Sequence, residues 1–269
     1  MRDGYVHGYA PREQQRLQDQ ARSLADLLHH DTAYPAGARV LEVGCGVGAQ
    51  TVTLARRSPG AEITAVDISA VSLAEAERAV EAAGFGNVRF LEADLFDLPF
   101  APESFDHVFA CFVLEHLAQP AAALERFIRL VRPGGTVTVI EGDHGLICFH
   151  PESAAARAAI ECQAALQRAV GGDALIGRRL YPLLRAAGLE AVRVSPRMVY
   201  VDGSRPDLAE SFTRDTFTAM IEGVATQAVE AGLADAAHFA AGVRDLHRTA
   251  EPDGMFTYTF FKGVGTRPA

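Results

Sequence analysis

The feature that most constrains the fold of this chain is a glycine-rich segment, Gly44-x-Gly46-x-Gly48, which directly follows an apolar run at residues 39–43. Such a run is typical of a buried strand in a parallel sheet. The glycines let the backbone turn tightly where a Cβ would collide with a ligand. A helix is expected directly afterwards, at 50–57. The segment therefore predicts the first strand, turn and helix of a doubly wound α/β sheet, with a nucleotide-like ligand at the turn.

An acidic residue ends each of the next two apolar runs. Asp67 follows residues 63–66, about twenty residues after the glycines, where nucleoside-binding sheets place the carboxylate that accepts ribose hydroxyls. Asp94 ends the run at 88–93, where it can accept a hydrogen bond from an adenine amino group. Because ligands bind at the carboxyl ends of parallel strands, we expect both acids and the glycine turn to form one adenosine site.

The glycine segment also fits the looser pattern of dinucleotide-binding sheets, because Gly44-x-Gly46-x-x-Ala49 satisfies G-x-G-x-x-G/A. A nicotinamide-dependent oxidoreductase is therefore an alternative reading of the motif. Glu42 favours a different ligand, since its charge would be poorly placed beside a pyrophosphate and well placed toward a positively charged group.

Two further segments extend the pattern: SFDHVFACFVLEHL at 104–117 and LVRPGG at 130–135. With these, residues 37–145 resemble the class I S-adenosylmethionine-dependent methyltransferases, specifically the small-molecule group that includes the quinone-biosynthesis C-methyltransferases. The resemblance implies a Rossmann-like, seven-stranded doubly wound sheet with an antiparallel last strand. It also implies S-adenosylmethionine as cofactor and in-line methyl transfer to a small-molecule acceptor. A cofactor-binding protein of this fold without methylating activity is a third hypothesis, because a fold does not secure a function.

The resemblance also assigns cofactor contacts. Asp67 would hold the ribose hydroxyls, Asp94 and Leu95 the adenine, and the backbone of Cys111 or Phe112 the methionine part. The predicted cofactor-binding residues are Tyr9, Gln20, Glu42, Gly44, Cys45, Gly46, Asp67, Ile68, Asp94, Leu95, Cys111 and Phe112.

Tyr9 and Gln20 come from an N-terminal segment with two tyrosines and a histidine in its first nine residues. It looks like the cofactor-covering segment of one branch of these methyltransferases. The alternative is an amphipathic helix with a frayed start.

The candidates for acceptor chemistry follow the fifth expected strand, at 136–141. His144 is the candidate catalytic residue, as a general base, and the alternative is a polar loop that shapes the pocket. His116 lies in an apolar segment and is interpreted as structural. Asp143 and His144 lack a second acidic pair at a recognisable spacing, so no metal site is predicted.

Beyond the fifth strand, the pattern predicts additional helices. The expected elements are helices at 152–170, 174–187, 207–231 and 234–249, and strands at 190–194 or somewhat longer and at 256–262. We expect residues 1–36 to form an N-terminal cofactor-covering helix and 37–269 the methyltransferase domain, with helical insertions at about 146–186 and 201–254 as a substrate lid.

The amino-acid composition limits the kinds of molecule that this protein is expected to bind. The net charge is −9 and Lys262 is the single lysine, which argues against nucleic acid or an anionic membrane surface. Four cysteines without CxxC spacing and the lack of an 18-residue apolar window predict a cytoplasmic protein. Aromatic residues of the expected lid, such as Phe212, Phe217 and Tyr200, favour a hydrophobic or aromatic acceptor from secondary or quinone metabolism, although helix packing explains them equally well. A homodimer is left open.

Overall fold

The computed structural model describes residues 24–269, so the predicted contacts of Tyr9 and Gln20 lie outside the described residues. The described chain divides into two compact units. We call residues 25–142, 176–197 and 260–269 the sheet unit, and residues 143–175 and 198–259, with residue 24, the accessory unit.

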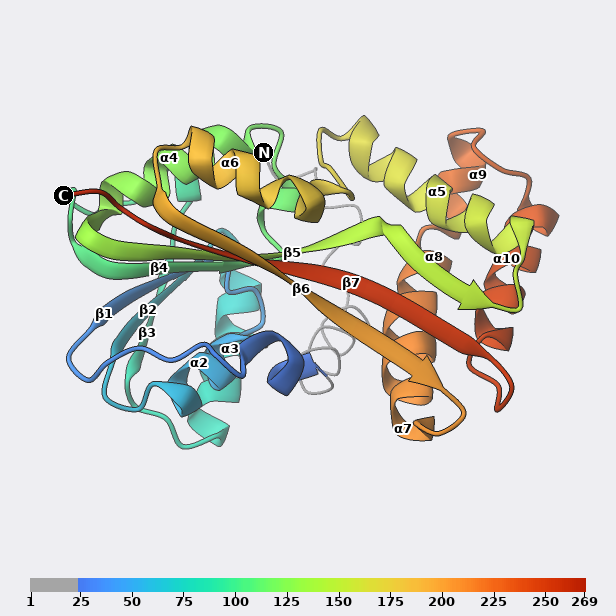
Figure 1. The fold of residues 1–269 in the computed structure, drawn as a ribbon, viewed down its shortest axis with the longest axis horizontal. Helices are drawn as coiled ribbons and strands as arrows, with labels where there is room; N and C mark the ends of the chain where they lie inside the picture. Colours follow the sequence, from blue (N-terminus) through green and yellow to red (C-terminus); the bar gives the residue numbers. More distant parts are fainter. Residues whose placement is uncertain (1–23) are drawn as a thin grey trace. The chain divides into compact units, whose positions relative to one another are not determined.

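A seven-stranded sheet has the order β3-β2-β1-β4-β5-β7-β6. Its strands are β1 (Arg39–Val43), β2 (Glu62–Asp67), β3 (Val88–Glu92), β4 (Phe105–Cys111), β5 (Val131–His150), β6 (Glu190–Asp202) and β7 (Met255–Thr266). The first five strands pair in parallel, whereas β7 runs in the opposite direction (Figure 1). The predicted Rossmann-like, doubly wound sheet with an antiparallel last strand is confirmed.

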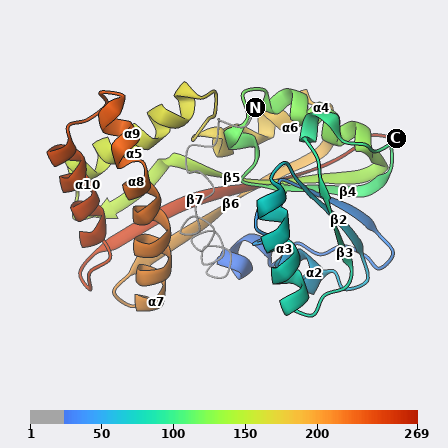
Figure 2. The same ribbon diagram turned by 180° about the vertical axis from the view of Figure 1, so that it is seen from behind.

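Helices cover both faces of the sheet unit. In both views, α2 (Thr51–Arg57) and α3 (Ala70–Ala82) lie on one face, and α4 (Pro120–Leu130) and α6 (Leu180–Ala186) on the other (Figures 1 and 2). The helix α3 begins where the Ser69 hydroxyl accepts a hydrogen bond from the Ser72 N–H (3.2 Å), and α4 begins with a proline, which suits a first turn. The buried face of α4, with Leu124 and Phe127, packs into the main hydrophobic core against β4 and β5.

The fifth strand is much longer than the expected 136–141. Its start includes Gly134 and Gly135, which precede the expected strand, because their backbone groups pair with those of Arg267 just beyond β7 (2.9 Å each). Its end continues to His150 because residues 147 and 149 are buried and alternate with exposed neighbours, which is the period of a strand. The sequence therefore predicted the strand but placed both of its ends wrongly.

The accessory unit contains most of the remaining helices. They are α5 (Ala154–Ala169), α7 (Pro206–Leu208), a π-helical segment (Ala209–Thr218), α8 (Ala219–Gly223), α9 (Ala225–Glu230) and α10 (Ala236–Arg248). The helices expected at 152–170 and 234–249 are confirmed, whereas the one expected at 207–231 is divided into four pieces. The helix expected at 174–187 is α6, preceded by a 3₁₀ turn at Ile176–Arg179.

Close packing of α5 on α10 depends on a glycine. A Cβ on Gly242 would overlap the backbone carbonyl of Ala155, so a larger residue would push the helices apart. The Ser153 hydroxyl also donates a hydrogen bond to Asp245 (2.5 Å). Across residues 24–269, no helix combines the length and apolar character that crossing a membrane requires.

Candidate functional site

The three glycines of the turn have different tasks. All have positive φ angles, of 69° at Gly44, 52° at Gly46 and 76° at Gly48. A Cβ on Gly44 would lie 2.6 Å from the Val113 side chain, and one on Gly48 would lie 2.8 Å from the Ala76 Cα. Among the atoms of residues 24–269, a Cβ on Gly46 would meet nothing within 4 Å. Gly44 and Gly48 are therefore required by packing inside the protein, whereas Gly46 borders open space where a ligand can approach the backbone.

Asp67 connects this turn to the start of α3. Its Oδ2 accepts a hydrogen bond from the Gly46 N–H (2.8 Å) and its Oδ1 one from the Ser69 N–H (2.9 Å). Burial raises the pKa of Asp67, while these two N–H groups oppose the shift. A carboxylate has about four lone-pair positions, so Asp67 can still accept hydroxyl groups of a ligand. The neighbouring Ile68 is 44% exposed.

Glu42 is a buried carboxylate with an unsatisfied oxygen. The residue is 2% exposed, and its Oε2 has no hydrogen-bond partner among the described residues. Burial raises the pKa of Glu42 to about 8, and the charge of Asp67 acts in the same direction. Since an unpaired buried charge is costly, a cationic ligand group beside Glu42 would supply the missing partner.

Because its pKa is raised on folding, Glu42 destabilises the ligand-free protein above mildly acidic pH. From about pH 4.5 to 8 the unfolded chain holds fewer protons at this position, so stability falls as pH rises, by on the order of 3 kcal/mol at pH 7. Glu42→Gln should therefore unfold at a higher urea concentration than the wild type at pH 8 and at a similar one at pH 4.5. A pH-independent difference would contradict this.

Asp94 lies beside Asp67. The Ala93 N–H donates to the Asp67 backbone carbonyl (3.0 Å), which brings the ends of β2 and β3 together. Asp94 caps the 3₁₀ turn Leu95–Asp97, and its Oδ1 accepts the Phe96 N–H (2.9 Å). The side chains of Asp94 and Leu95 are both half-buried. The structure thus brings the glycine turn, Asp67 and Asp94 to one edge of the sheet.

The end of β4 holds a strained residue. Phe112 has a φ of 57°, a left-handed conformation that a bulky side chain rarely adopts. Its N–H donates to the Ile140 carbonyl (2.8 Å), and its ring packs 5.3 Å from that of Phe260. Cys111 and Cys45 are buried, and burial raises the pKa of both thiols. Backbone strain at the carboxyl end of a strand is typical of a functional position.

Glu141 maintains this region, a role that the sequence prediction missed. It is fully buried and accepts the backbone N–H groups of Val113 (3.1 Å), Leu114 (2.8 Å) and Glu115 (3.3 Å). Glu141 therefore fixes the segment that follows Phe112. The available signal was an acid at the end of the otherwise apolar run 137–140. His116 ends the same 3₁₀ turn, with its Nε2 3.7 Å from a Glu115 oxygen.

A second missed cluster surrounds the single lysine. Lys262 is buried and donates to Asp31 (2.6 Å) and to the Thr32 hydroxyl (2.5 Å), while Arg197 donates to the other Asp31 oxygen (2.6 Å). Burial alone would raise the pKa of Asp31, but the hydrogen bonds from Lys262 and Arg197 outweigh this effect and lower the pKa to about 2. The cluster attaches the chain just before β1 to strands β6 and β7.

His144 belongs to the accessory unit and is 8% exposed. Its Nδ1 lies 3.0 Å from the Tyr258 hydroxyl, and its backbone N–H donates to the Ala174 carbonyl (3.0 Å). Asp143 is buried and accepts the Gly145 N–H (3.0 Å). Among residues 24–269, no group of three or more histidine, cysteine or acidic side chains is arranged to hold a metal ion.

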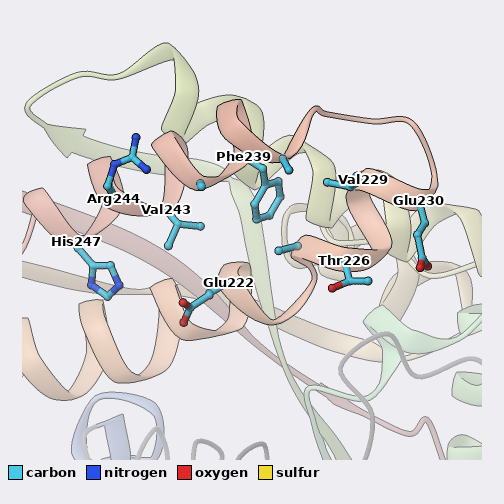
Figure 3. Close-up of a pocket in the computed structure, with 11 residues that line it drawn as sticks. Glu222, Thr226, Val229, Glu230, Phe239, Val243, Arg244 and His247 are labelled. Carbon is cyan, nitrogen blue, oxygen red and sulfur yellow. The ribbon is translucent and has the colours of Figure 1, made fainter.

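The accessory unit also has a groove of about 680 Å³ (Figure 3). Its wall is largely apolar, with Val229 of α9 and Phe239 and Val243 of α10, and charged groups such as Glu222 and Arg244 border it. None of the predicted site residues within 24–269 is among those that line this groove.

The sequence is similar to those of known methyltransferases. Residues 40–135 match the methyltransferase domain family. A demethylmenaquinone methyltransferase from Thermus thermophilus is 40% identical over 103 residues, which are 38% of this chain and 46% of that protein. An O-methyltransferase, resE, from Aspergillus sclerotiorum is 30% identical over 159 residues, which are 56% of this chain and 59% of that protein. The chain thus spans about half the length of these curated relatives.

Among solved structures, phosphoethanolamine N-methyltransferase 2 from Haemonchus contortus, in complex with S-adenosyl-L-methionine, aligns with a TM-score of 0.56 and 18% identity. The alignment covers 93% of this chain and 53% of that one, and at this identity it supports the fold alone. Together with the sheet order and the family match over residues 40–135, these similarities show that the chain contains a class I methyltransferase domain, as its motifs predicted.

Proposed function

We propose that this protein binds S-adenosylmethionine in its sheet unit and transfers the methyl group to a small hydrophobic or aromatic acceptor. The observation that carries the proposal is Glu42, which lies two residues before the glycine turn. Its buried Oε2 has no hydrogen-bond partner among residues 24–269, and the charge of Asp67 acts on this carboxyl group. A nucleoside with a positively charged amino acid group matches both features, whereas a pyrophosphate would add negative charge beside a buried carboxylate.

The residues present fit this cofactor. Asp67 would accept the ribose hydroxyls and Asp94 the adenine amino group, while Gly46 leaves room for close approach. Glu42 would pair with the ammonium group, and the strained backbone of Phe112 would contact the methionine part. When bound, S-adenosylmethionine supplies an already activated methyl group. The main task of the protein is therefore alignment, which can contribute about 7 to 11 kcal/mol to lowering the barrier.

The variant Glu42→Gln, which tests the stability of the free protein, also tests cofactor binding. Glu42→Gln should weaken binding of S-adenosylhomocysteine in calorimetry, because the amide cannot supply a negative charge. For the wild type, affinity should rise with pH up to about 8, since the bound ammonium group favours the ionised form of Glu42. Retention of NADH instead of the adenosyl ligand would favour the oxidoreductase alternative.

The proposed acceptor class rests on the curated relatives and on the side chains of the accessory unit. The relatives named above include a demethylmenaquinone methyltransferase and an O-methyltransferase, both of which match this chain over about half their length. The aromatic residues of the accessory unit are compatible with an apolar acceptor, and we propose that this unit serves as the predicted lid. A mass-spectrometric screen of quinones, phenols and polyketides with S-adenosylmethionine would test the acceptor class.

The predictions of a homodimer, of a cytoplasmic location and of no nucleic-acid partner stay open.

We further propose His144 as the general base for an acceptor that must lose a proton. The support is its place on β5, three residues after Glu141, and its burial among aromatic rings. His144→Ala should lower turnover by about 100-fold or more and leave affinity for S-adenosylhomocysteine nearly unchanged. The rate for an acidic acceptor should rise through the histidine pKa in the wild type but not in the variant.

His150 provides the matched control, because it lies on the same strand and is exposed. His150→Ala should retain the wild-type rate and pH profile. Equal rates and profiles for His144→Ala and the wild type would exclude His144 as the base. A loss of the pH inflection in His150→Ala would then assign the proton to His150, and a wild-type profile for both variants would leave Tyr9 or alignment alone as the explanation.

A further inference from the structure

A buried histidine holds a glutamine beside the glycine turn. Gln50 comes two residues after Gly48 and directly before α2, and its side chain does not cap that helix. Its Oε1 lies 2.7 Å from Nε2 of His29, which is fully buried. These residues all belong to the sheet unit. The contact therefore joins the chain before β1 to the start of α2 within a single unit.

The hydrogen bond between these two side chains has a defined direction. The amide oxygen of Gln50 can only accept, so Nε2 of His29 must donate to it. Burial lowers the pKa of His29 to about 4, and a neutral imidazole carries a single N–H. Nδ1 is buried and has no hydrogen-bond partner among residues 24–269, so a proton there would be unpaired. Both observations place the proton of the neutral ring on Nε2.

The pair lies at the level of Glu42 on the sheet. Glu42 on β1 is in register with Phe109 on β4, and side chains in register on neighbouring parallel strands point to the same face. The His29 ring packs against the Phe109 ring, with the centroids 5.7 Å apart. Gln50 is half-buried and is held by His29. This chain of contacts brings Gln50 to the face of the sheet that carries Glu42.

A cofactor with an amino acid group needs two kinds of partner on this face. Its ammonium group would pair with Glu42, and its carboxylate is attached to the same carbon atom. An arginine or lysine placed for the carboxylate would also pair with Glu42 and compete with the ammonium group. A neutral amide donates hydrogen bonds without this competition. Within residues 24–269 the Gln50 amide nitrogen has no hydrogen-bond partner, so its two N–H groups are available to a ligand.

We propose that Gln50 is a specificity-determining residue that donates its amide N–H groups to the carboxylate of the cofactor, and that His29 is the positioning residue that orients it. The inference rests on the proposed function. Because Nε2–H of His29 holds Oε1, the amide cannot turn its oxygen toward the carboxylate, where two acceptors would repel each other. The site would therefore select ligands that carry both charges of the amino acid group.

Two ligands that differ only in the carboxylate test this selectivity. Calorimetry compares S-adenosylhomocysteine with its decarboxylated analogue, in which a hydrogen atom replaces the carboxylate and the amine is kept. The wild type should bind S-adenosylhomocysteine about tenfold or more tightly than the analogue, since hydrogen bonds to charged groups are strong. Gln50→Ala should lose most of this preference, because it binds S-adenosylhomocysteine more weakly while its affinity for the analogue stays nearly unchanged.

The positioning role of His29 is tested through the same preference. His29→Phe keeps a ring against Phe109 but removes the N–H, and it should reduce the preference about threefold or more. His107→Phe is the matched control. His107 lies on the same face, with Nδ1 2.8 Å from the Thr136 hydroxyl, but near the amino end of β4, so its variant should keep the wild-type preference. A general loss of stability would weaken binding of both ligands alike.

The tautomer of His29 can be measured without any ligand. In ¹⁵N-histidine-labelled protein at neutral pH, the signals missing from His29→Phe identify His29, and we expect a protonated Nε2 and an unprotonated Nδ1. A proton on Nδ1 would overturn the positioning role. If S-adenosylhomocysteine binds but the wild type shows no preference, or Gln50→Ala keeps it, the role of Gln50 is wrong and the proposed function stands. If neither ligand binds, the proposed function fails and this inference fails with it.

Discussion

Gly46→Val should abolish cofactor binding, with a loss of more than about 1,000-fold in affinity for S-adenosylhomocysteine. The φ of 52° is unfavourable for a β-branched residue, and a Cβ there would extend into space that no atom of the described residues occupies within 4 Å. The new side chain would therefore conflict with the ligand and not with the protein core. Calorimetry on the folded variant measures the effect.

Gly84 provides a control for backbone strain. It follows α3 with a φ of 77°, and in the described part of the chain a Cβ there would also meet nothing within 4 Å. Gly84→Val should lose about 1 to 2 kcal/mol of stability, comparable to the loss in Gly46→Val, but should bind the cofactor normally. If both variants bind equally well, the turn at Gly46 does not approach a ligand and the interpretation of the motif is wrong.

The part of the sheet that carries the glycine turn and the two acidic residues could be predicted from the sequence, because its sequence motifs are local. The glycine turn, Asp67 and Asp94 each follow a short apolar strand, and parallel pairing brings strand ends together without any knowledge of side-chain packing. The structure adds that Asp67 directly supports the turn through the Gly46 N–H. That hydrogen bond explains why the glycines and the acid occur together.

The unpredicted features depend on contacts between distant residues. Glu141 ends the expected fifth strand, and it accepts N–H groups from residues 26 to 28 positions earlier. The bond between Lys262 and Asp31 joins residues 231 positions apart. The π-helical segment has no distinct sequence signal, since its apolar positions also suit an ordinary helix. Such pairings could only be found once the strands were placed.

Asp67→Ala should weaken binding of S-adenosylhomocysteine by about 2 to 4 kcal/mol, or about 30-fold to 1,000-fold, because it removes a charge-assisted pair of hydrogen bonds to the ribose. The variant should still fold, although the N–H groups of Gly46 and Ser69 lose their acceptor. Asp67→Asn keeps the side-chain shape and one acceptor oxygen, so its loss should be smaller. Isothermal titration calorimetry would give the affinities.

A variant of Asp106 is the control for Asp67→Ala. It separates the loss of ligand contacts from the general effect of removing a buried acidic side chain. Asp106 lies near the start of β4, where it accepts the Arg39 N–H (2.7 Å) and forms ion pairs with Arg39 and Arg132. Because this is the amino end of a parallel strand, Asp106→Asn should lower stability without changing cofactor affinity. Equal affinity for Asp67→Ala and the wild type would remove Asp67 from the cofactor site. Since Asp67 also holds the Gly46 N–H, that result would contradict the glycine-turn interpretation as well.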